Sequence, residues 1–368
     1  MRIPGFATEE GTARFKARFE AELPHHLRKA NGLWVSSIGL GTYLGEPTAA
    51  YDALYSESVT RAAELGINVF DSAINYRHQR SERVIAHALT ALIAAGHLRR
   101  DEVILATKGG FLTFDADEPP DPAAYFHEKL IATGLVQPED VAAGCHVMSP
   151  RYLHHQIELS RRNLGVETID IYYLHNPETQ LSTVSREEFY RRLRAAFEAL
   201  EKSVAENKIR MYGAATWNAF RQSPNDGEAI SLAEVLRIAA EVGGENHHFR
   251  ALKLPFNFAM PQALVARSQV WRGKPVTVLE IARAYGLLAF ASASLMQAHL
   301  VQGLPPQIRE KFPGLRTDAQ CAIQFVRSTP GITCALVGMG RREHVEENLA
   351  TARVAPFTTE EFIAAFAK

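Results

Sequence analysis

The stretch IDIYYL at Ile169–Leu174 is a short apolar run rich in β-branched and aromatic residues, a pattern that predicts a buried strand. Helical patterns flank it on both sides. Ser149, with Pro150 at the first helical position, opens the helix before it, and the capping pair Ser185/Glu188 opens the helix after it. A buried strand between two helices is the repeating unit of a parallel α/β fold. This stretch therefore indicates the fold class.

Seven more stretches of the same kind occur along the chain, and their starts are roughly 30–65 residues apart, close to one βα unit plus insertions. The eight expected strands are Ser37–Leu40, Ile67–Phe70, Val103–Thr107, Ile169–Leu174, Arg210–Ala214, Ala251–Leu254, Leu287–Phe290 and Cys334–Val337. Eight βα units favour a closed (β/α)₈ barrel, the TIM barrel, over an open doubly wound sheet.

Capping residues and apolar periodicity indicate where the helices between these strands begin. Ser81 is expected to open a helix that Gly96 ends, because apolar residues repeat every four positions between them. Further capping boxes are Ser231/Glu234, Thr277/Glu280, Thr317/Gln320 and Thr358/Glu361.

Two segments lie outside the regular alternation. Residues 14–35, with the turn pair Asn31-Gly32, predict an N-terminal β-hairpin. The connection 109–150, after the third strand, contains the acidic and proline-rich stretch 115–122 and predicts a long loop that closes over the active-site mouth. No linker or repeat interrupts the pattern, so we expect residues 1–368 to form one domain.

The composition narrows the function class. Forty basic and forty-one acidic side chains give a net charge of −1, which argues against a dedicated partner such as nucleic acid or a membrane surface. No apolar run is long enough for a transmembrane helix.

Three cysteines without a C-x-x-C pair favour a reducing, cytoplasmic compartment. The fourteen histidines lack metal-ligand spacing, so no metal site is expected, and no oligomeric state is indicated.

Ionisable residues follow three consecutive strands. The second strand runs into Asp71, the third into Lys108 and the fourth into His175. The carboxyl ends of barrel strands meet at one mouth, so these side chains are expected close together, with Asp71 and Lys108 as an ion pair. The alternative is that the pair only stabilises the barrel rim.

Tyr76 follows Asp71 by five residues and can reach the same mouth. A phenol has a reference pKa near 10, and a neighbouring lysine would lower it toward the range of a useful acid or base. His175 would then orient a substrate carbonyl or relay a proton. Tyr76 as a merely packed loop residue is the alternative.

A phosphate site is expected after the last strand. Gly338 and Gly340 precede Arg341 and Arg342 at the start of a helix, where free backbone N–H groups and guanidinium groups favour an anion. The small hydroxyl residues after the seventh strand, Ser292 and Ser294, suit the neighbouring part of a pyrophosphate.

Together these segments resemble the aldo-keto reductases, NAD(P)H-dependent barrel enzymes, over roughly residues 33–351. The matching stretches are Gly39–Thr42, Asp71–Tyr76, Thr107-Lys108, Tyr173–His175 and Gly338–Leu349. The resemblance implies a catalytic tetrad of Asp71, Tyr76, Lys108 and His175. It also implies that Tyr76 is the general acid and that hydride passes from a nicotinamide to an aldehyde or ketone carbon.

The resemblance further implies cofactor contacts, with two departures. Ala215-Thr216 stand where the family has a Ser-Asn pair, and Lys253 stands where it has a glutamine that binds the carboxamide. An ammonium can donate to an amide oxygen but cannot accept from its NH₂ group. The implied cofactor residues are Gly41, Thr42, Thr216, Lys253, Phe290 (stacked on the nicotinamide), Ser292, Ser294, Gly338, Gly340, Arg341, His344, Glu347 and Asn348.

Arg341 matches the residue that meets a 2′-phosphate, which favours NADP(H), although NAD(H) stays open. The expected substrate is a small carbonyl compound or sugar, bound near Tyr43, Phe111, Asn176 and Trp217. Two alternatives remain: an NAD-dependent pyranose or sugar dehydrogenase, and a slow-turnover cofactor-binding subunit that senses redox state.

Overall fold

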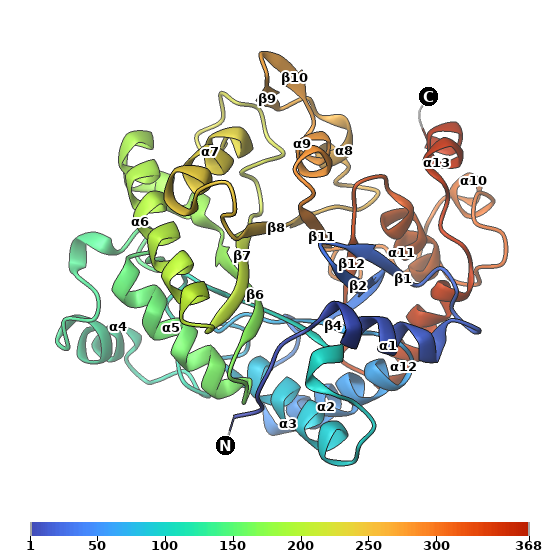
Figure 1. Ribbon diagram of the computed structural model, residues 1–368, viewed down its shortest axis with the longest axis horizontal. Coiled ribbons are helices and arrows are strands. Elements are labelled where there is room, and N and C mark those ends of the chain that lie inside the picture. The colour runs from blue at the N-terminus through green and yellow to red at the C-terminus, as the bar shows by residue number, and fades with distance from the viewer. Residues whose placement is uncertain (1, 367–368) are drawn as a thin grey trace.

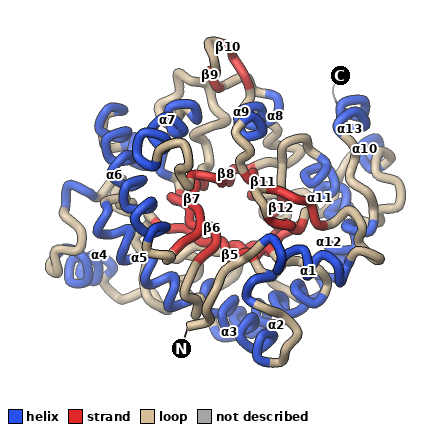
Figure 2. Tube along the Cα trace, in the orientation of Figure 1, coloured by secondary structure: helices blue, strands red, loops and turns tan. Residues whose placement is uncertain are grey.

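Eight parallel strands form a closed barrel in the computed structural model, which describes residues 2–366. Around the ring the order is β11-β12-β3-β4-β5-β6-β7-β8, and Figure 2 shows the strands enclosed by helices. The strands are β3 (Ile38–Gly41), β4 (Val69–Asp71), β5 (Ile104–Gly109), β6 (Ile169–His175), β7 (Ile209–Ala215), β8 (Phe249–Pro255), β11 (Leu288–Ser292) and β12 (Cys334–Gly338). All eight expected strands and the (β/α)₈ fold class are confirmed.

One main helix follows each barrel strand. These helices are α2 (Ala49–Glu64), α3 (Arg80–Ala94), α5 (Pro150–Asn163), α6 (Arg186–Ala205), α7 (Leu232–Gly243), α9 (Val278–Ala284), α11 (Asp318–Ser328) and α12 (Arg342–Leu349). The expected caps hold where a side-chain oxygen accepts from a backbone amide, as Ser185 does from Glu188. Ser81 is not a cap. Gln79, with a φ of 71°, precedes α3, and the Ser81 hydroxyl donates to the Thr42 carbonyl at 2.8 Å.

Apolar side chains fill two layers because strand residues alternate between the two faces of the sheet. Val69, Ile104 and Ile171 point into the barrel, whereas Phe70 and Leu105 pack outward against the helices. The carboxyl ends of the strands are left for polar groups, and the functional side chains gather there.

A β-hairpin closes the amino-terminal end of the barrel. Strands β1 (Leu27–Ala30) and β2 (Leu33–Ser36) pair antiparallel, and Leu33 and Val35 belong to the apolar cluster inside the barrel. The expected start of the hairpin at residue 14 is wrong, because Glu9–Phe19 is helix α1 (Figure 1). Thr8 caps this helix, and its charges favour it, acidic in the first turn and basic in the last.

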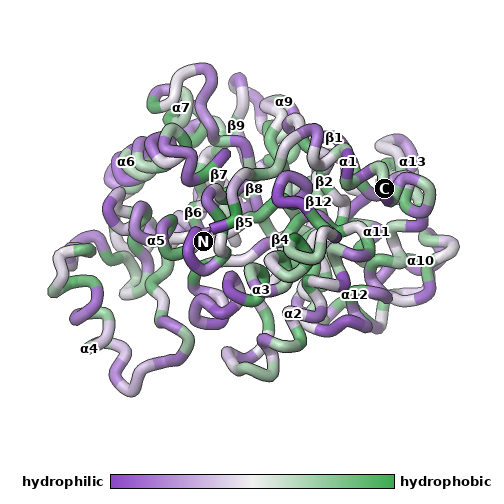
Figure 3. The backbone as a smooth tube through the Cα atoms, turned by 60° about the horizontal axis from the view of Figure 1, so that its bottom comes forward, coloured by the Kyte–Doolittle hydropathy of each residue, from purple (hydrophilic) through white to green (hydrophobic). Residues whose placement is uncertain are grey.

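The long connection after β5 lies beside the barrel rather than over its mouth. It contains α4 (Pro122–Phe126) and projects at the rim next to α5 in two views (Figures 1 and 3). Val136 and Val147 anchor it on Tyr152 of α5. Of residues 109–150, only Phe111 lines the large cavity at the mouth, so the expected closure is wrong. The apolar residues of this segment pack instead into a small separate core with Tyr152.

Short elements decorate the rest of the surface. They are α8 (Gln262–Val265), the β9–β10 hairpin (Gln269–Trp271 and Lys274–Val276), α10 (Pro306–Arg309), α13 (Thr359–Phe366) and single turns at Arg100–Glu102, His127–Ile131, Pro138–Asp140, Pro177–Ser182 and Ala350–Arg353. Among residues 2–366, no helix has both the length and the apolar character needed to cross a bilayer.

Candidate active site

A cavity of about 990 Å³ opens at the carboxyl ends of the strands. Asp71 ends β4, Lys108 lies near the end of β5, and His175 ends β6, while Tyr76 follows on the loop after β4. All four line this cavity, so the structure brings together the residues that the strand ends indicated.

The Asp71 carboxylate is shared by two lysines. Its Oδ1 atom accepts from Lys108 Nζ at 2.8 Å and from Lys253 Nζ at 2.5 Å, while its Oδ2 atom is buried without a partner in residues 2–366. Burial alone would raise the pKa of Asp71, but the two ammonium groups outweigh burial and hold that pKa below its usual value. Asp71 is therefore ionised at neutral pH, and the trio carries one net positive charge.

The Tyr76 ring lies within this charged cluster. Lys108 Nζ is 4.3 Å from the ring centroid, and the rings of Tyr43 and His175 approach edge-on at 5.0 and 5.7 Å. Burial raises the pKa of Tyr76 to about 12, and the positive charge of Lys253 offsets only part of this rise. The expected lowering is thus wrong for the protein alone. Tyr76 is a neutral phenol, ready to donate a proton rather than to accept one.

His175 is also neutral, because burial first and then the charges of Lys108 and Lys253 hold its pKa well below the usual value. His146, from the long connection, supports it. Its Nε2 atom lies 2.8 Å from the His175 carbonyl oxygen, and its Nδ1 atom accepts from Gln180 at 2.9 Å. The Phe111 ring lies edge-on to both histidines. Nothing in the sequence around Cys145 and His146 indicated that His146 would contact His175.

The other end of the cavity contains the glycines and the arginine that the sequence indicated as a phosphate site. Gly338 and Gly340 lie beside Leu44 and Tyr55, and a Cβ atom on Gly340 would stand 3.4 Å from the Tyr55 ring. Arg341 precedes α12 and lines the cavity without a carboxylate partner in residues 2–366, whereas Arg342 pairs with Glu346 at 3.1 Å and lies outside it.

The structure tests where the expected contact residues lie. Those that line the cavity are Gly41, Thr42, Tyr43, Phe111, Asn176, Thr216, Trp217, Lys253, Ser292, Ser294, Gly338, Gly340, Arg341, His344, Glu347 and Asn348. Phe290 does not. It is 1% exposed inside the barrel, edge-on to Tyr173, because inward-pointing residues of β11 alternate and Phe290 lies one layer below the cavity floor.

Some residues that line the cavity were not predicted from the sequence. Asn75 and Tyr55 line the cavity, as do several residues between Leu295 and Val301. In and just before that segment, Ala293, Met296, Gln297 and Ala298 have φ values of 48–72°, a left-handed conformation that no glycine in the sequence indicates.

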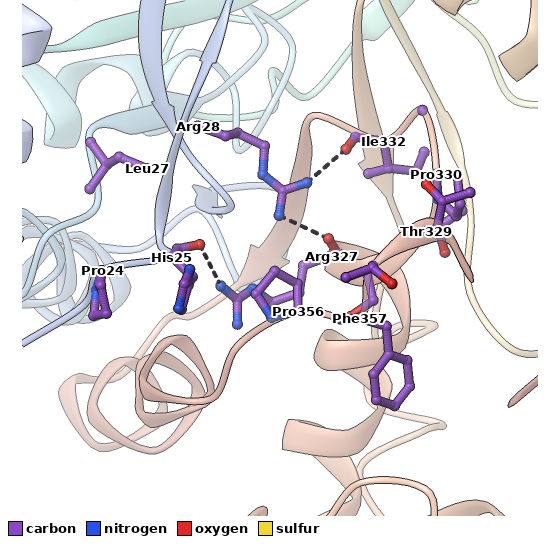
Figure 4. A pocket seen from close by; sticks show the side chains of 14 residues that line it. Pro24, His25, Leu27, Arg28, Arg327, Thr329, Pro330, Ile332, Pro356 and Phe357 are labelled. Carbon is purple, nitrogen blue, oxygen red and sulfur yellow. Dashed lines mark hydrogen bonds between the residues drawn. The ribbon is translucent and has the colours of Figure 1, made fainter. Parts of the chain in front are cut away.

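A second cavity, of about 440 Å³, lies at the amino-terminal end of the barrel. Figure 4 shows Arg28 and Arg327 facing backbone carbonyls there: Arg28 donates to Ile332 and Arg327, and Arg327 donates to His25. No ionisable residue of the catalytic cluster lines it. The candidate active site is therefore the cavity at the carboxyl-terminal mouth.

The fold and the mouth define a (β/α)₈ barrel enzyme with an acid–base cluster at its strand ends. The family model described as "Aldo/keto reductase family" matches residues 37–223, about half of the chain. The chain belongs to the aldo/keto reductase family, and it is an oxidoreductase of that family.

Similar proteins match either most of the chain or about half of it. The "uncharacterized oxidoreductase YqkF" of Bacillus subtilis is 22% identical over 335 residues, covering 89% of this chain and 90% of that protein. A "putative voltage-gated potassium channel subunit beta" of Schizosaccharomyces pombe is 24% identical over 199 residues, covering 54% and 46%. The crystal structure of an aldo/keto reductase from Klebsiella pneumoniae "in complex with NADP and acetate" superposes with a TM-score of 0.59 at 22% identity, covering 93% and 94%.

Proposed function

We propose that this protein reduces aldehydes or ketones with NADPH, or oxidises the matching alcohols with NADP⁺. The observation that carries the proposal is the neutral Tyr76 phenol, which lines the cavity beside an ionised Lys108–Asp71 pair and a neutral His175. The NADP named for the Klebsiella structure supports the choice of cofactor.

The residues present fit a nicotinamide dinucleotide. The Thr216 hydroxyl is buried, lines the cavity and has no partner in residues 2–366, so it is available to the carboxamide. Ser292 and Ser294 would meet the pyrophosphate, and Arg341 the 2′-phosphate. When bound, this cofactor supplies the hydride for the carbonyl carbon.

The chain supplies the proton and the orientation. Tyr76 Oη–H donates its proton to the carbonyl oxygen as that oxygen gains negative charge, and the phenolate left behind is later reprotonated from water. His175 holds the same oxygen by a hydrogen bond. Tyr43, Phe111 and Trp217, with Asn176, form a largely aromatic wall that suits an aromatic or sugar-like carbonyl compound.

Tyr76→Phe is the decisive test of the proposed acid. Removing the hydroxyl should lower kcat for carbonyl reduction by about 10²–10⁴-fold, the usual contribution of a general acid, with NADPH affinity nearly unchanged. The measurement is NADPH oxidation against a panel of aldehydes, ketones and sugars. Tyr285→Phe, at an exposed tyrosine outside the cavity, is the matched control. Undiminished turnover in Tyr76→Phe would refute the assignment.

Arg341→Ala tests the cofactor. Losing one charged hydrogen-bond pair should weaken NADPH binding by about 2 kcal/mol, or roughly thirtyfold, and NADH binding far less. Fluorescence titration with both cofactors measures the difference. Arg342→Ala is the control, because its guanidinium pairs with Glu346 outside the cavity. An equal loss for both cofactors would mean that the phosphate site lies elsewhere.

A second candidate is a cofactor-binding subunit with slow turnover. The partial similarity to a protein named as a channel subunit favours it, as does Ala215 where the family has a polar residue. Single-turnover hydride transfer separates the two functions. A transfer rate far below one per minute, with cofactor retained through gel filtration, would favour the subunit.

A further inference from the structure

Lys253 lies where the sequence indicated a carboxamide contact, yet its ammonium group points to Asp71. Its Nζ atom is 2.5 Å from Asp71 Oδ1, the same oxygen that Lys108 contacts. Two buried ammonium groups and one buried carboxylate leave one positive charge uncompensated. Such a charge is costly inside a barrel unless an anion forms next to it.

The two lysines are not equivalent. Lys108 is fully buried, donates to Asp71 and to the Ser72 carbonyl, and lies over the face of the Tyr76 ring. Both lysines line the cavity, but the Lys253 ammonium donates only to Asp71 among residues 2–366. Through Asp71, Lys253 belongs to the same ion cluster as Lys108, whose Nζ atom lies 4.3 Å from the centroid of the Tyr76 ring. Burial lowers the pKa of Lys253 and the Asp71 charge opposes that lowering, while the charge of Lys253 acts to lower the pKa of Tyr76. Lys253 therefore adds a second cation to the ion cluster that borders the phenol.

We infer that Lys253 is a positioning residue for Tyr76: by sharing Asp71 with Lys108, it holds one net positive charge beside the phenol and stabilises the phenolate that forms when Tyr76 releases its proton. This inference rests on the proposed function and deepens it. In reduction, the O–H bond of Tyr76 breaks as the new O–H bond of the alcohol forms, and the electron pair stays on the phenolate oxygen next to Lys253.

The other groups around Tyr76 do not supply a second positive charge beside that of Lys108. His175 is neutral, Tyr43 is a phenol, and Asp71 opposes a second anion. Lys108 faces the ring, but without Lys253 its charge would be balanced by the single carboxylate of Asp71. Removing Lys253 would leave a balanced Lys108–Asp71 pair and no excess charge for the phenolate.

A direct test titrates the phenol at position 76 without cofactor or substrate. Replacing Tyr76 with 3,5-difluorotyrosine brings the titration into an accessible pH range, and phenolate absorbance measures it. Lys253→Met should raise the pKa of this fluorotyrosine by about 1 or more, a tenfold loss of acidity, and Lys253→Arg should restore most of it. An unchanged pKa in a folded Lys253→Met protein would overturn the inference.

A kinetic test uses the natural phenol. Alcohol oxidation needs the phenolate, so its pH–kcat profile should move to higher pH in Lys253→Met and return in Lys253→Arg. A weaker affinity for NADPH with an unmoved profile would instead show a simple cofactor contact and overturn the inference. If Lys253→Met does not fold, Lys253→Gln keeps a donor for Asp71 without the charge, and the same outcomes apply.

The two proposals fail separately. Turnover that survives Tyr76→Phe would refute the proposed function, while the fluorotyrosine titration would still report whether Lys253 sets the acidity of the phenol. A normal loss of activity in Tyr76→Phe together with no shift in the titration would retain the function and refute the role of Lys253.

Discussion

Each end of the barrel holds a pair of neighbouring cations, buried at the carboxyl-terminal mouth and partly buried at the other end, and the partners of these cations differ. At the carboxyl-terminal mouth, Lys108 and Lys253 share the Asp71 carboxylate and border a large cavity. At the amino-terminal end, Arg28 and Arg327 contact neutral oxygens, chiefly backbone carbonyls, and no carboxylate within residues 2–366.

This difference shows how side-chain chemistry separates support from catalysis. The Arg327 guanidinium donates to Ser37, Gln324, Thr351, Val354 and His25. All three of its nitrogen atoms donate hydrogen bonds that hold separate chain segments together. Burial and the charge of Arg28 lower its pKa to about 9. The compact ammonium of Lys253 donates to Asp71 alone among residues 2–366, so two of its three N–H groups have no protein acceptor.

The largest expected effect is at the amino-terminal end. Arg327→Met should lower the free energy of unfolding by about 5 kcal/mol, because it removes the donor of five hydrogen bonds, three of them to backbone carbonyls and three of them fully buried. Urea unfolding measures this loss, and kcat per folded molecule should stay close to that of the unmodified protein. A large fall in kcat with normal stability would contradict the division between the two ends.

Asp71→Asn should cost somewhat less, about 3 kcal/mol at neutral pH, because it leaves Lys108 and Lys253 buried without a counterion. The pKa of Asp71 is lowered in the folded protein, so its contribution is present above the unfolded value near 4 and is lost as the pH falls through the folded value. Unfolding at several pH values should therefore show the two proteins converging below about pH 4. A constant difference down to pH 2 would contradict the ion cluster.

The smallest effect is expected for Arg28→Met, about 1–2 kcal/mol, because Arg28 is only partly buried and donates to two carbonyls. Lys29→Met is the matched control at the neighbouring position, where an exposed lysine pairs with Glu9 and should contribute almost nothing. Thermal or urea unfolding of both variants measures the contrast. Equal losses would show that the carbonyl contacts of Arg28 are not worth more than a surface ion pair.

The eight strands were predictable because each carries a local pattern, and the order of βα units leaves few topologies. Asp71, Lys108 and His175 were predictable for the same reason, since each directly follows its strand pattern. The hairpin expected at residues 14–35 was given too early a start. A helix with ordinary capping precedes the hairpin, and its capping pattern was overlooked.

The sequence alone could not show which ion pairs and packing contacts form between side chains that are far apart along the chain. Lys253 is 182 positions from Asp71 along the chain, and only barrel closure brings them together. Phe290 was misplaced by one layer because the depth of a side chain inside the barrel depends on strand stagger, which no local pattern records. The support of His175 by His146 likewise depends on the path of the long connection.

Arg28 contacts carbonyls at positions 327 and 332, about 300 residues further along the chain. During synthesis on a ribosome, the hairpin that carries Arg28 emerges early and must wait for these partners. The amino-terminal end of the barrel can therefore close only after residue 332 has left the exit tunnel. A nascent chain halted before that point also lacks β12, which lies between β11 and β3 in the ring, and two members of the apolar cluster around Leu33 and Val35, namely Cys334 and Leu336.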